Sequence, residues 1–174
     1  MRSAFRGPAV AAALILLALA VACSKSPTRP PVTEVRASVT VEPSTGSPSN
    51  PVTMVFRAEN AGTTQLWHCS GCGCGNGTSV TVLGPDGIAV ALSDPLAVRP
   101  LCPDGDVPFQ PGEVLGNGAR FTGVLYVKDS TVPPSPTYAA PAGKYTVVAT
   151  LTYAASHPGE AIGITRRATF DWNP

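Results

Sequence analysis

Much of this chain alternates between apolar and polar residues with a period of two, and this pattern restricts its fold more than any other feature. In residues 35–42, valine or alanine at odd positions alternates with polar residues at even positions. Residues 52–59, 120–128 and 145–153 continue the same kind of alternation. Successive side chains of a β-strand point to opposite faces of a sheet, so these stretches predict strands with one buried face.

Shorter stretches complete the predicted set of strands. Residues 65–69 carry Trp67, residues 79–83 and 88–92 flank the turn Gly84-Pro85-Asp86-Gly87, and the last strand covers about residues 162–172. No stretch after residue 23 has a helical period, and 17 glycines and 19 prolines supply many turns. About seven to eight strands of this kind predict an all-β fold, an antiparallel immunoglobulin-like (Greek-key) β-sandwich.

The register of the two longest predicted strands also defines a core. Met54, Phe56, Tyr145, Val147 and Leu151 lie on the apolar side of their strands, so we expect them to be buried together. Hydrophobic residues make up 44% of the chain and charged residues only 13%, which is enough apolar material for such a core. The 174 residues leave room for one domain of ordinary size.

Local patterns refine the prediction. Gly143, Lys144 and Tyr145 resemble the tyrosine corner of Greek-key sandwiches. Arg166 and Arg167 place one charge on the apolar side of the last strand, which predicts a bulge or an exposed edge. Residues 93–110 show no clear strand, and the proline-rich residues 129–141 are expected to form either a spacer or a displayed binding loop.

The N-terminus has the features of an export signal. Arg2 and Arg6 precede an uninterrupted apolar run over residues 9–22, which is shorter than the roughly 20 residues that a membrane-spanning helix needs. The residues Leu19-Ala20-Val21-Ala22-Cys23 resemble the lipobox of bacterial lipoproteins, with alanine where that family usually has leucine three places before the cysteine. The resemblance implies cleavage before Cys23 and a lipid anchor on its sulfur. A secreted protein with an unmodified Cys23 is the alternative.

These features predict three parts of the chain. Residues 1–22 are the signal peptide, residues 23–32 are the lipidated Cys23 and a flexible tether rich in serine and proline, and residues 33–174 are the sandwich domain. The residue after Cys23 is serine rather than aspartate, which by resemblance to many lipoproteins favours the outer membrane. The membrane is therefore the first expected partner, through the anchor on Cys23.

Four further cysteines form the most unusual feature of the chain. Cys69, Cys72 and Cys74 lie close together among glycines, and Cys102 follows about 30 residues later. An even number of cysteines in an exported protein favours disulfides, and three pairings are possible. A bridge between Cys72 and Cys74 would be strained, so we predict that Cys102 is bonded to a cysteine of the first cluster.

A metal site is the alternative use of the same residues. The spacing C-x2-C-x-C, with His68 beside it and Cys102 available, offers soft ligands suited to zinc or Cu(I). Thiolates must stay reduced to bind a metal, and an oxidising compartment works against this, so no cofactor is expected. A redox-active or partly free set of thiols is the third possibility.

Other residues carry weaker signals. Asp104 and Asp106 offer too few oxygens for a Ca²⁺ site and are expected to lie in a solvated turn, and His157 is expected at the surface of a hairpin turn. No catalytic motif for acyl transfer, metalloprotease chemistry or phosphate binding is present, so we do not expect an enzyme. The formal net charge is +1 and no basic cluster occurs, which argues against nucleic acid as a partner.

A family resemblance adds to this interpretation. Residues 55–62 (VFRAENAG), the turn at 84–87, Gln110-Pro111-Gly112-Glu113 and residues 141–147 (PAGKYTV) occur in an order that resembles the BsuPI-type proteinase-inhibitor domain, an immunoglobulin-like sandwich. The resemblance covers roughly residues 35–153 and implies protease inhibition. The aromatic-acidic stretch that this family has before its central hairpin is replaced here by the cysteine-rich segment.

Three hypotheses of function follow from the sequence. The first is a non-enzymatic envelope lipoprotein that presents its immunoglobulin-like domain for binding or for structural work, with another envelope protein as a candidate partner. The second is a BsuPI-like protease inhibitor, with a protease as its partner. The third is a metal-binding or redox module built on Cys69, Cys72, Cys74 and Cys102, with His68 beside them.

Overall fold

The alternating stretches form long strands in the structure, a computed structural model that describes residues 33–69, 77–97 and 105–174. These residues contain no helix, and so none that could cross a membrane. The strands, in chain order, are β1 (Val35–Glu42), β2 (Thr45–Gly46), β3 (Val52–Asn60), β4 (Leu66–Cys69), β5 (Thr78–Leu83), β6 (Ala89–Val90), β7 (Asp106–Phe109), β8 (Val114–Phe121), β9 (Val124–Tyr126), β10 (Thr137–Ala139), β11 (Gly143–Ala154) and β12 (Ala161–Trp172).

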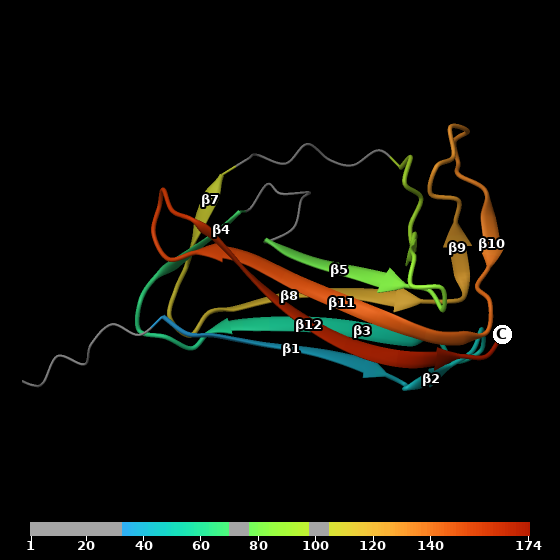
Figure 1. Cartoon of the computed structure of the whole chain (residues 1–174), viewed down its shortest axis with the longest axis horizontal. Helices are drawn as coiled ribbons and strands as arrows, with labels where there is room; N and C mark the ends of the chain where they lie inside the picture. Colours follow the sequence, from blue (N-terminus) through green and yellow to red (C-terminus); the bar gives the residue numbers. More distant parts are fainter. Residues whose placement is uncertain (1–32, 70–76, 98–104) are drawn as a thin grey trace, which may run out of the picture. The chain divides into compact units, whose positions relative to one another are not determined.

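Two sheets carry the fold. The first has the order β1-β3-β8, and both of its pairs are antiparallel. The second has the order β2-β12-β11-β4-β7, with β5 also paired to β11 and β6 paired to β5. Its only parallel pair is the short one between β2 and β12. β9 and β10 form a separate two-stranded ribbon, and Figure 1 shows the long strands running side by side along the molecule.

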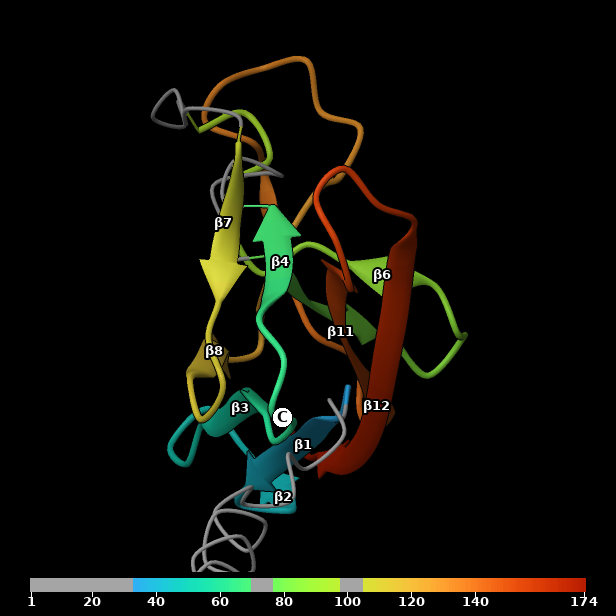
Figure 2. The same ribbon diagram turned by 90° about the vertical axis from the view of Figure 1, so that its left-hand side faces the viewer.

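The order in which the chain visits the two sheets identifies the architecture. β1 and β3 belong to the first sheet, β4 crosses to the second, β8 returns to the first, and β11 and β12 close the second. Figure 2 shows β3 and β8 on one side and β11 and β12 on the other when the molecule is viewed from its end. This is the Greek-key plan of an immunoglobulin-like sandwich, as predicted. The strands are more numerous than predicted because several short ones flank the long ones.

The predicted core residues are all buried, but they do not form one group. Met54, Tyr145 and Val147 belong to a cluster that also contains Phe121, Phe170 and Trp172. Phe56 and Leu151 belong to a second cluster with Leu66 and Phe109. The expectation of a single group was wrong because each strand is long enough to cross both halves of the sandwich, so neighbouring inward residues pack in different clusters.

The tyrosine corner is present. The Tyr145 hydroxyl donates a hydrogen bond of 2.9 Å to the carbonyl oxygen of Pro141, four residues earlier, and the side chain is fully buried. Its ring stacks on Phe170, with 5.3 Å between ring centroids and 12° between planes. Burial raises the pKa of Tyr145 above its ordinary value of 10.0. The tyrosine thus fixes the start of β11 against the segment that precedes it.

Asn60 joins three segments where β3 ends. Its side-chain amide donates to the carbonyl oxygens of Thr64, at 2.9 Å, and Phe109, at 2.8 Å, and its Oδ1 accepts from the Gly62 amide. Its backbone carbonyl accepts from the Gly112 amide at 2.8 Å. A fully buried asparagine with its polar atoms paired in this way is a structural clamp between the β3–β4 loop and the β7–β8 turn.

The strand prediction missed or displaced several elements. Residues 120–128 were expected to form one strand, but β8 ends at Phe121 and β9 begins at Val124, with Gly123 at a φ of +81° between them. The first part of β8 was missed because Gly116, Asn117 and Gly118 show no apolar alternation. β7 was missed because it contains Pro108, which a terminal strand of a sheet tolerates.

The double arginine of the last strand lies on an edge, and there is no bulge. β12 pairs residue by residue with β11 from Gly143↔Trp172 to Ala154↔Ala161, so the ladder contains no extra residue. On its other side, β12 pairs only with the two residues of β2. Arg166 and Arg167 are exposed there, and the Arg166 Nε donates to the carbonyl oxygen of Ala37 at 2.9 Å. The exposed edge was therefore predicted correctly and the bulge was not.

Candidate functional site

The cysteine-rich part of the chain is attached at one end of the sandwich, where β4 and β7 lie side by side (Figure 2). β4 and β5 both pair with β11, on neighbouring positions: Tyr153 is opposite His68 and Leu151 is opposite Thr78. The end of β4 and the beginning of β5 therefore meet at one point of the sheet. Residues 70–76, which lie between them in sequence, are outside the described residues.

Alternation along β4 separates two candidate ligands. His68 is only 5% exposed, and its ring meets Phe109 edge-on with 6.1 Å between centroids. Cys69, the next residue, lies on the opposite parity of the strand and is half-buried. The two side chains therefore start from opposite faces of β4, and His68 belongs to the packed interior.

Three of the four disulfide candidates lie outside the described residues, namely Cys72, Cys74 and Cys102. Cys69 is not a free thiol in the structure. The pairing of the four cysteines stays a prediction, as does Cys23, which is also outside the described residues. Within the part of the chain that the structure describes, no group of three or more His, Cys, Asp or Glu side chains is placed to hold a metal ion.

The structure brings together three residues that sequence reasoning left apart. The His157 Nδ1 donates to the Asp106 Oδ2 at 2.8 Å, and the ring of His157 lies 5.0 Å from the ring of Trp67, centroid to centroid. Trp67 comes from β4, Asp106 from β7 and His157 from the turn between β11 and β12. We call these three residues the end cluster. Side-chain exposures of 49% for His157 and 43% for Asp106 leave the pair accessible.

Two predictions change as a result. Asp106 was expected in a solvated turn, but it is the first residue of β7 and lies opposite Cys69. His157 does lie in a hairpin turn, as predicted, but it is held by a carboxylate and an aromatic ring rather than standing alone. The signal that was missed is long-range: Asp106 and His157 are 51 residues apart, and only the pairing of β4 with both β7 and β11 brings them together.

A cavity of about 240 Å³ opens beside the end cluster. Its lining combines aromatic and aliphatic residues with polar ones, among them Asp106 and the hydroxyl-bearing Thr152 and Tyr153. The lining residues are Trp67, His68, Cys69, Asp106, Thr152, Tyr153, Ala154, Gly159 and Ala161. Aromatic walls with a few polar groups are typical of places where a protein receives a side chain or a small polar group of a partner.

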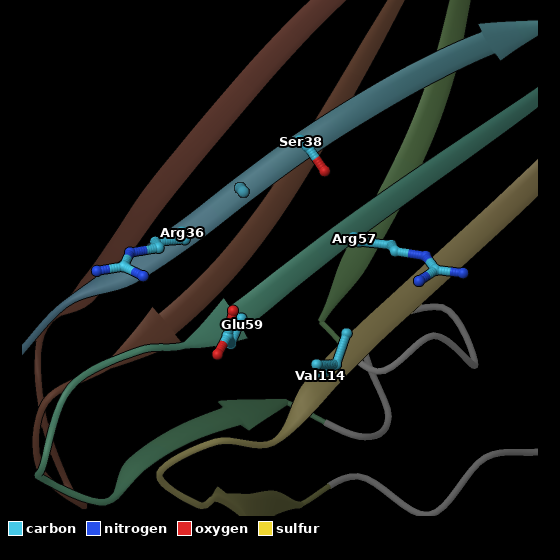
Figure 3. A pocket seen from close by; sticks show the side chains of 6 residues that line it. Arg36, Ser38, Arg57, Glu59 and Val114 are labelled. Carbon is cyan, nitrogen blue, oxygen red and sulfur yellow. The ribbon is translucent and has the colours of Figure 1, made fainter.

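A second hollow lies on the outer face of the first sheet (Figure 3). It measures about 280 Å³ and is lined by Arg36, Ala37, Ser38, Arg57, Glu59 and Val114. Arg36 already pairs with Glu34, at 2.8 Å between Nε and Oε1. Figure 3 shows the side chain of Arg57 reaching from β3 toward β8, with Glu59 nearby on the same strand. Charges of both signs line this open hollow.

The proline-rich residues 129–141 are neither a bare spacer nor a free loop. They include β10. Ser135, which precedes β10, is only 3% exposed and is hydrogen-bonded to Asp94. The Ser135 hydroxyl donates to Asp94 Oδ1 at 2.6 Å, and the Leu96 amide donates to the same oxygen at 2.9 Å. These hydrogen bonds lower the pKa of the Asp94 carboxyl, and the bond from the Ser135 hydroxyl contributes most. The loop is thereby fixed to residues 93–96.

No protein-family model and no curated protein sequence matches the chain. Among solved structures, the ApaA protein from Bordetella pertussis is 12% identical, with a TM-score of 0.40, over 83% of this chain and 96% of ApaA. The sporulation control protein Spo0M from Bacillus subtilis is 12% identical, with a TM-score of 0.40, over 82% of this chain and 51% of Spo0M.

The third comparison is with α2-macroglobulin from Escherichia coli. A part of it is 12% identical, with a TM-score of 0.43, over 82% of this chain and 17% of that structure. The chain thus spans about half of Spo0M and about a sixth of the macroglobulin structure. The class of the protein, an immunoglobulin-like β-sandwich, follows from its own strand order, register and tyrosine corner.

Proposed function

We propose that this chain is a non-enzymatic lipoprotein of the bacterial cell envelope that presents an immunoglobulin-like domain for binding. The basic and apolar N-terminal residues and the lipobox-like sequence ending at Cys23 support export and lipidation. Acyl chains on Cys23 would hold the protein to the membrane, since several chains anchor stably where one does not. The serine after Cys23 favours the outer membrane.

The end cluster is the observation that carries the proposed binding role. Two strands remote in sequence place the Trp67 indole and the Asp106 carboxylate in the lining of one accessible cavity, and the His157 imidazole contacts both of these groups beside it. Such a surface offers apolar contact area together with hydrogen-bond donors and acceptors, the combination that dominates binding energy at protein interfaces. We propose another envelope protein as the partner of this end.

The anchor is tested by the substitution Cys23→Ser. We expect radiolabelled palmitate to enter the wild-type protein and not the variant, and the variant to leave the membrane fraction. Ser24→Ala, which keeps the cysteine, serves as the matched control and should be labelled as the wild type is. Label found in Cys23→Ser would show that the lipobox interpretation is wrong.

The binding end is tested by a photo-cross-linking residue placed at Ala161, on the rim of the cavity. We expect a discrete adduct with an envelope protein in intact cells, and we expect it to be reduced when Trp67 is changed to Ala. The same cross-linker at Thr53, an exposed position on the outer face of β3, is the control and should give no such adduct. An identical pattern from both positions would contradict a binding role for the end cluster.

The protease-inhibitor hypothesis rests on the order of sequence motifs. The contacts of these motifs hold the sandwich together, which gives a reason for their order other than inhibition. Asn60 is bonded to Gly112 of the P-G-E turn, and Tyr145 is bonded to Pro141 of the PAGKY sequence. Such bonds would favour these motifs in a sandwich of this kind whatever it binds. An inhibition assay on a panel of proteases separates the two hypotheses, and metal analysis with a thiol count tests the metal or redox module.

A further inference from the structure

A groove of about 430 Å³ opens on the side of the sandwich where both sheets end, away from the end cluster. β8 is the last strand of the first sheet, and β6 is paired only with β5 in the second. Asn117 Nδ2 on β8 donates to the Thr78 carbonyl oxygen on β5 at 3.3 Å. This bond joins the two sheets.

The groove is lined by apolar residues and by polar ones such as Thr81 and Ser93. Val80, Val90, Leu92 and Ala119 line it, and all four are partly buried residues packed against the first core cluster. They come from β5, from β6 and the residues after it, and from β8, so both sheets contribute. Their exposed area is surface that a ligand would remove from water, at about 25 cal/mol per Å². The volume lies in the range of small-molecule sites, about 300–1,000 Å³.

The rim of the groove carries one positive charge. Lys128 lines it, is exposed, and makes no ion pair or hydrogen bond with any residue that the structure describes. Asp94, which lies between the lining residues Ser93 and Pro95 in the chain, has its carboxylate oxygens bonded to Ser135 and to the Leu96 amide instead. Asp129, next to Lys128 in the chain, makes no ion pair with it either. The ammonium is therefore available to an anionic group.

We propose that this groove binds an amphiphile with an unbranched apolar chain and a single carboxylate, the chain lying on Val80, Val90, Leu92 and Ala119 and the carboxylate on Lys128. Charge complementarity with Lys128 selects the head group. This inference does not depend on the end cluster or on the lipid anchor. A matching ammonium amphiphile would meet a like charge at the rim and bind more weakly.

The experiment uses the full chain carrying Cys23→Ser, so that no attached acyl chain competes for the groove. Binding of octanoate, octanol and octylammonium is measured by calorimetry, and the site is located by methyl NMR perturbations. We expect octanoate to bind best and to perturb the methyl signals of Val80, Val90 and Leu92. Lys128→Gln should weaken octanoate binding roughly fivefold while leaving octanol binding unchanged, as loss of one partly solvated ion pair implies.

Two variants of neighbouring residues provide the controls. Ala119→Leu fills the groove and should abolish binding of octanoate and octanol alike, and Arg120→Gln, on the opposite face of β8, should change neither. If Ala119→Leu does not fold, the methyl perturbations of the unmodified groove still decide the location. The proposal is overturned if octanoate does not bind saturably, if octylammonium binds as tightly, if Lys128→Gln has no effect, or if the perturbed methyls lie elsewhere.

Discussion

At the scale of single residues, burial along one strand alternates sharply enough to be tested by neighbouring substitutions. Phe56 is fully buried, whereas the next residue back, Val55, lies on the outer face of β3 and is only half-buried. Phe56→Ala should lower the free energy of unfolding by about 3–5 kcal/mol, through lost burial and the cavity left behind. Val55→Ala is the matched control and should cost much less in the same denaturant titration. Equal losses would contradict the register of β3.

The tyrosine corner gives a second test at this scale. Tyr145→Phe keeps the ring and removes the hydroxyl, which leaves the Pro141 carbonyl without that donor. The free energy of unfolding should fall by about 1 kcal/mol, the usual net worth of one such hydrogen bond. Tyr153→Phe, on the same strand and without a hydrogen bond in the described part of the chain, should stay within about 0.5 kcal/mol of the wild type.

The same residue predicts a dependence on pH. Burial, together with the nearby Tyr138 and Asp86, raises the pKa of Tyr145 above 10.0. As the pH rises past 10, the unfolded chain loses this proton before the folded chain does, so the free energy of unfolding falls. Between about pH 9 and pH 11 the wild type should lose stability more steeply than Tyr145→Phe. Parallel slopes for the two proteins would show that Tyr145 titrates normally.

Residue-level prediction succeeded where a local pattern exists. The inward residues of β3 and β11 could be named from alternation, and Tyr145 from its distance to Gly143. His157 could be placed in a turn but not beside Asp106, because no local pattern shows which strand lies next to that turn. The buried clamp of Asn60 was also missed, since its partners, Phe109 and Gly112, are about 50 residues away.

At the scale of elements, the junction between β8 and β9 depends on a glycine. Gly123 has a φ of +81°, and a Cβ on it would overlap the ring of Trp172. Gly112, in the β7–β8 turn, has a φ of +80°, but a Cβ there would meet no atom within 4 Å. Gly112→Ala should therefore cost about 1–2 kcal/mol from backbone strain alone. Gly123→Ala should cost a further 1–3 kcal/mol, roughly the range for an overpacked core.

Thermal or denaturant unfolding of both alanine variants measures this difference directly. Because the two φ angles are alike, the comparison isolates the contact with Trp172 from the backbone strain. Equal losses would mean that Trp172 does not pack against the junction. The junction also explains why residues 120–128 do not form one strand: the left-handed backbone at Gly123 turns the chain out of the first sheet and into the β9–β10 ribbon.

The strands were predicted from the pattern of their side chains, so the prediction failed for strands that are defined by backbone pairing with a neighbour. β1, β3 and β11 were predicted nearly to the residue because one face of each is buried or partly buried, and β12 was predicted as closely although it buries only Phe170 and Trp172. β8 pairs with β3 along its whole length, but two glycines on its outer face hide the alternation. β7 is short and contains a proline, and it becomes a strand because β4 offers an edge to pair with. Such strands are defined by their neighbours rather than by their own residues.

At the scale of the whole molecule, the features with binding potential lie in different places on the sandwich. The end cluster sits where β4, β7 and the β11–β12 turn meet, and the apolar groove opens between β5, β6 and β8. The chain enters the fold beside the β3–β4 loop, where the Gly62 amide donates to the carbonyl oxygen of Glu34. The β9–β10 ribbon lies at the opposite end of the sandwich from the start of β1 (Figure 1).

The cysteine-rich sequence begins beside the end cluster, because Cys69 is the last residue of β4 and lines the same cavity. We predict that in the mature protein Cys102 is covalently bonded to Cys69, Cys72 or Cys74. Asp106 lies opposite Cys69 in the β4–β7 pair, and Cys102 is four residues before Asp106, a span of at most about 14 Å even when fully extended. Closing a loop of about 30 residues would contribute roughly 3–4 kcal/mol by restricting the unfolded chain.

Mass spectrometry of peptides from protein recovered from the envelope, digested without reduction, should show a peptide containing Cys102 linked to one from the first cluster. The same digest after reduction and alkylation is the control, in which the linked species must disappear. Cys102→Ser should lower the free energy of unfolding, because the segment around it contains four prolines and few apolar residues and gains little from packing alone. Four free, alkylatable thiols in the unreduced sample would reject the disulfide, and stoichiometric metal in that sample would support coordination by the cysteines instead.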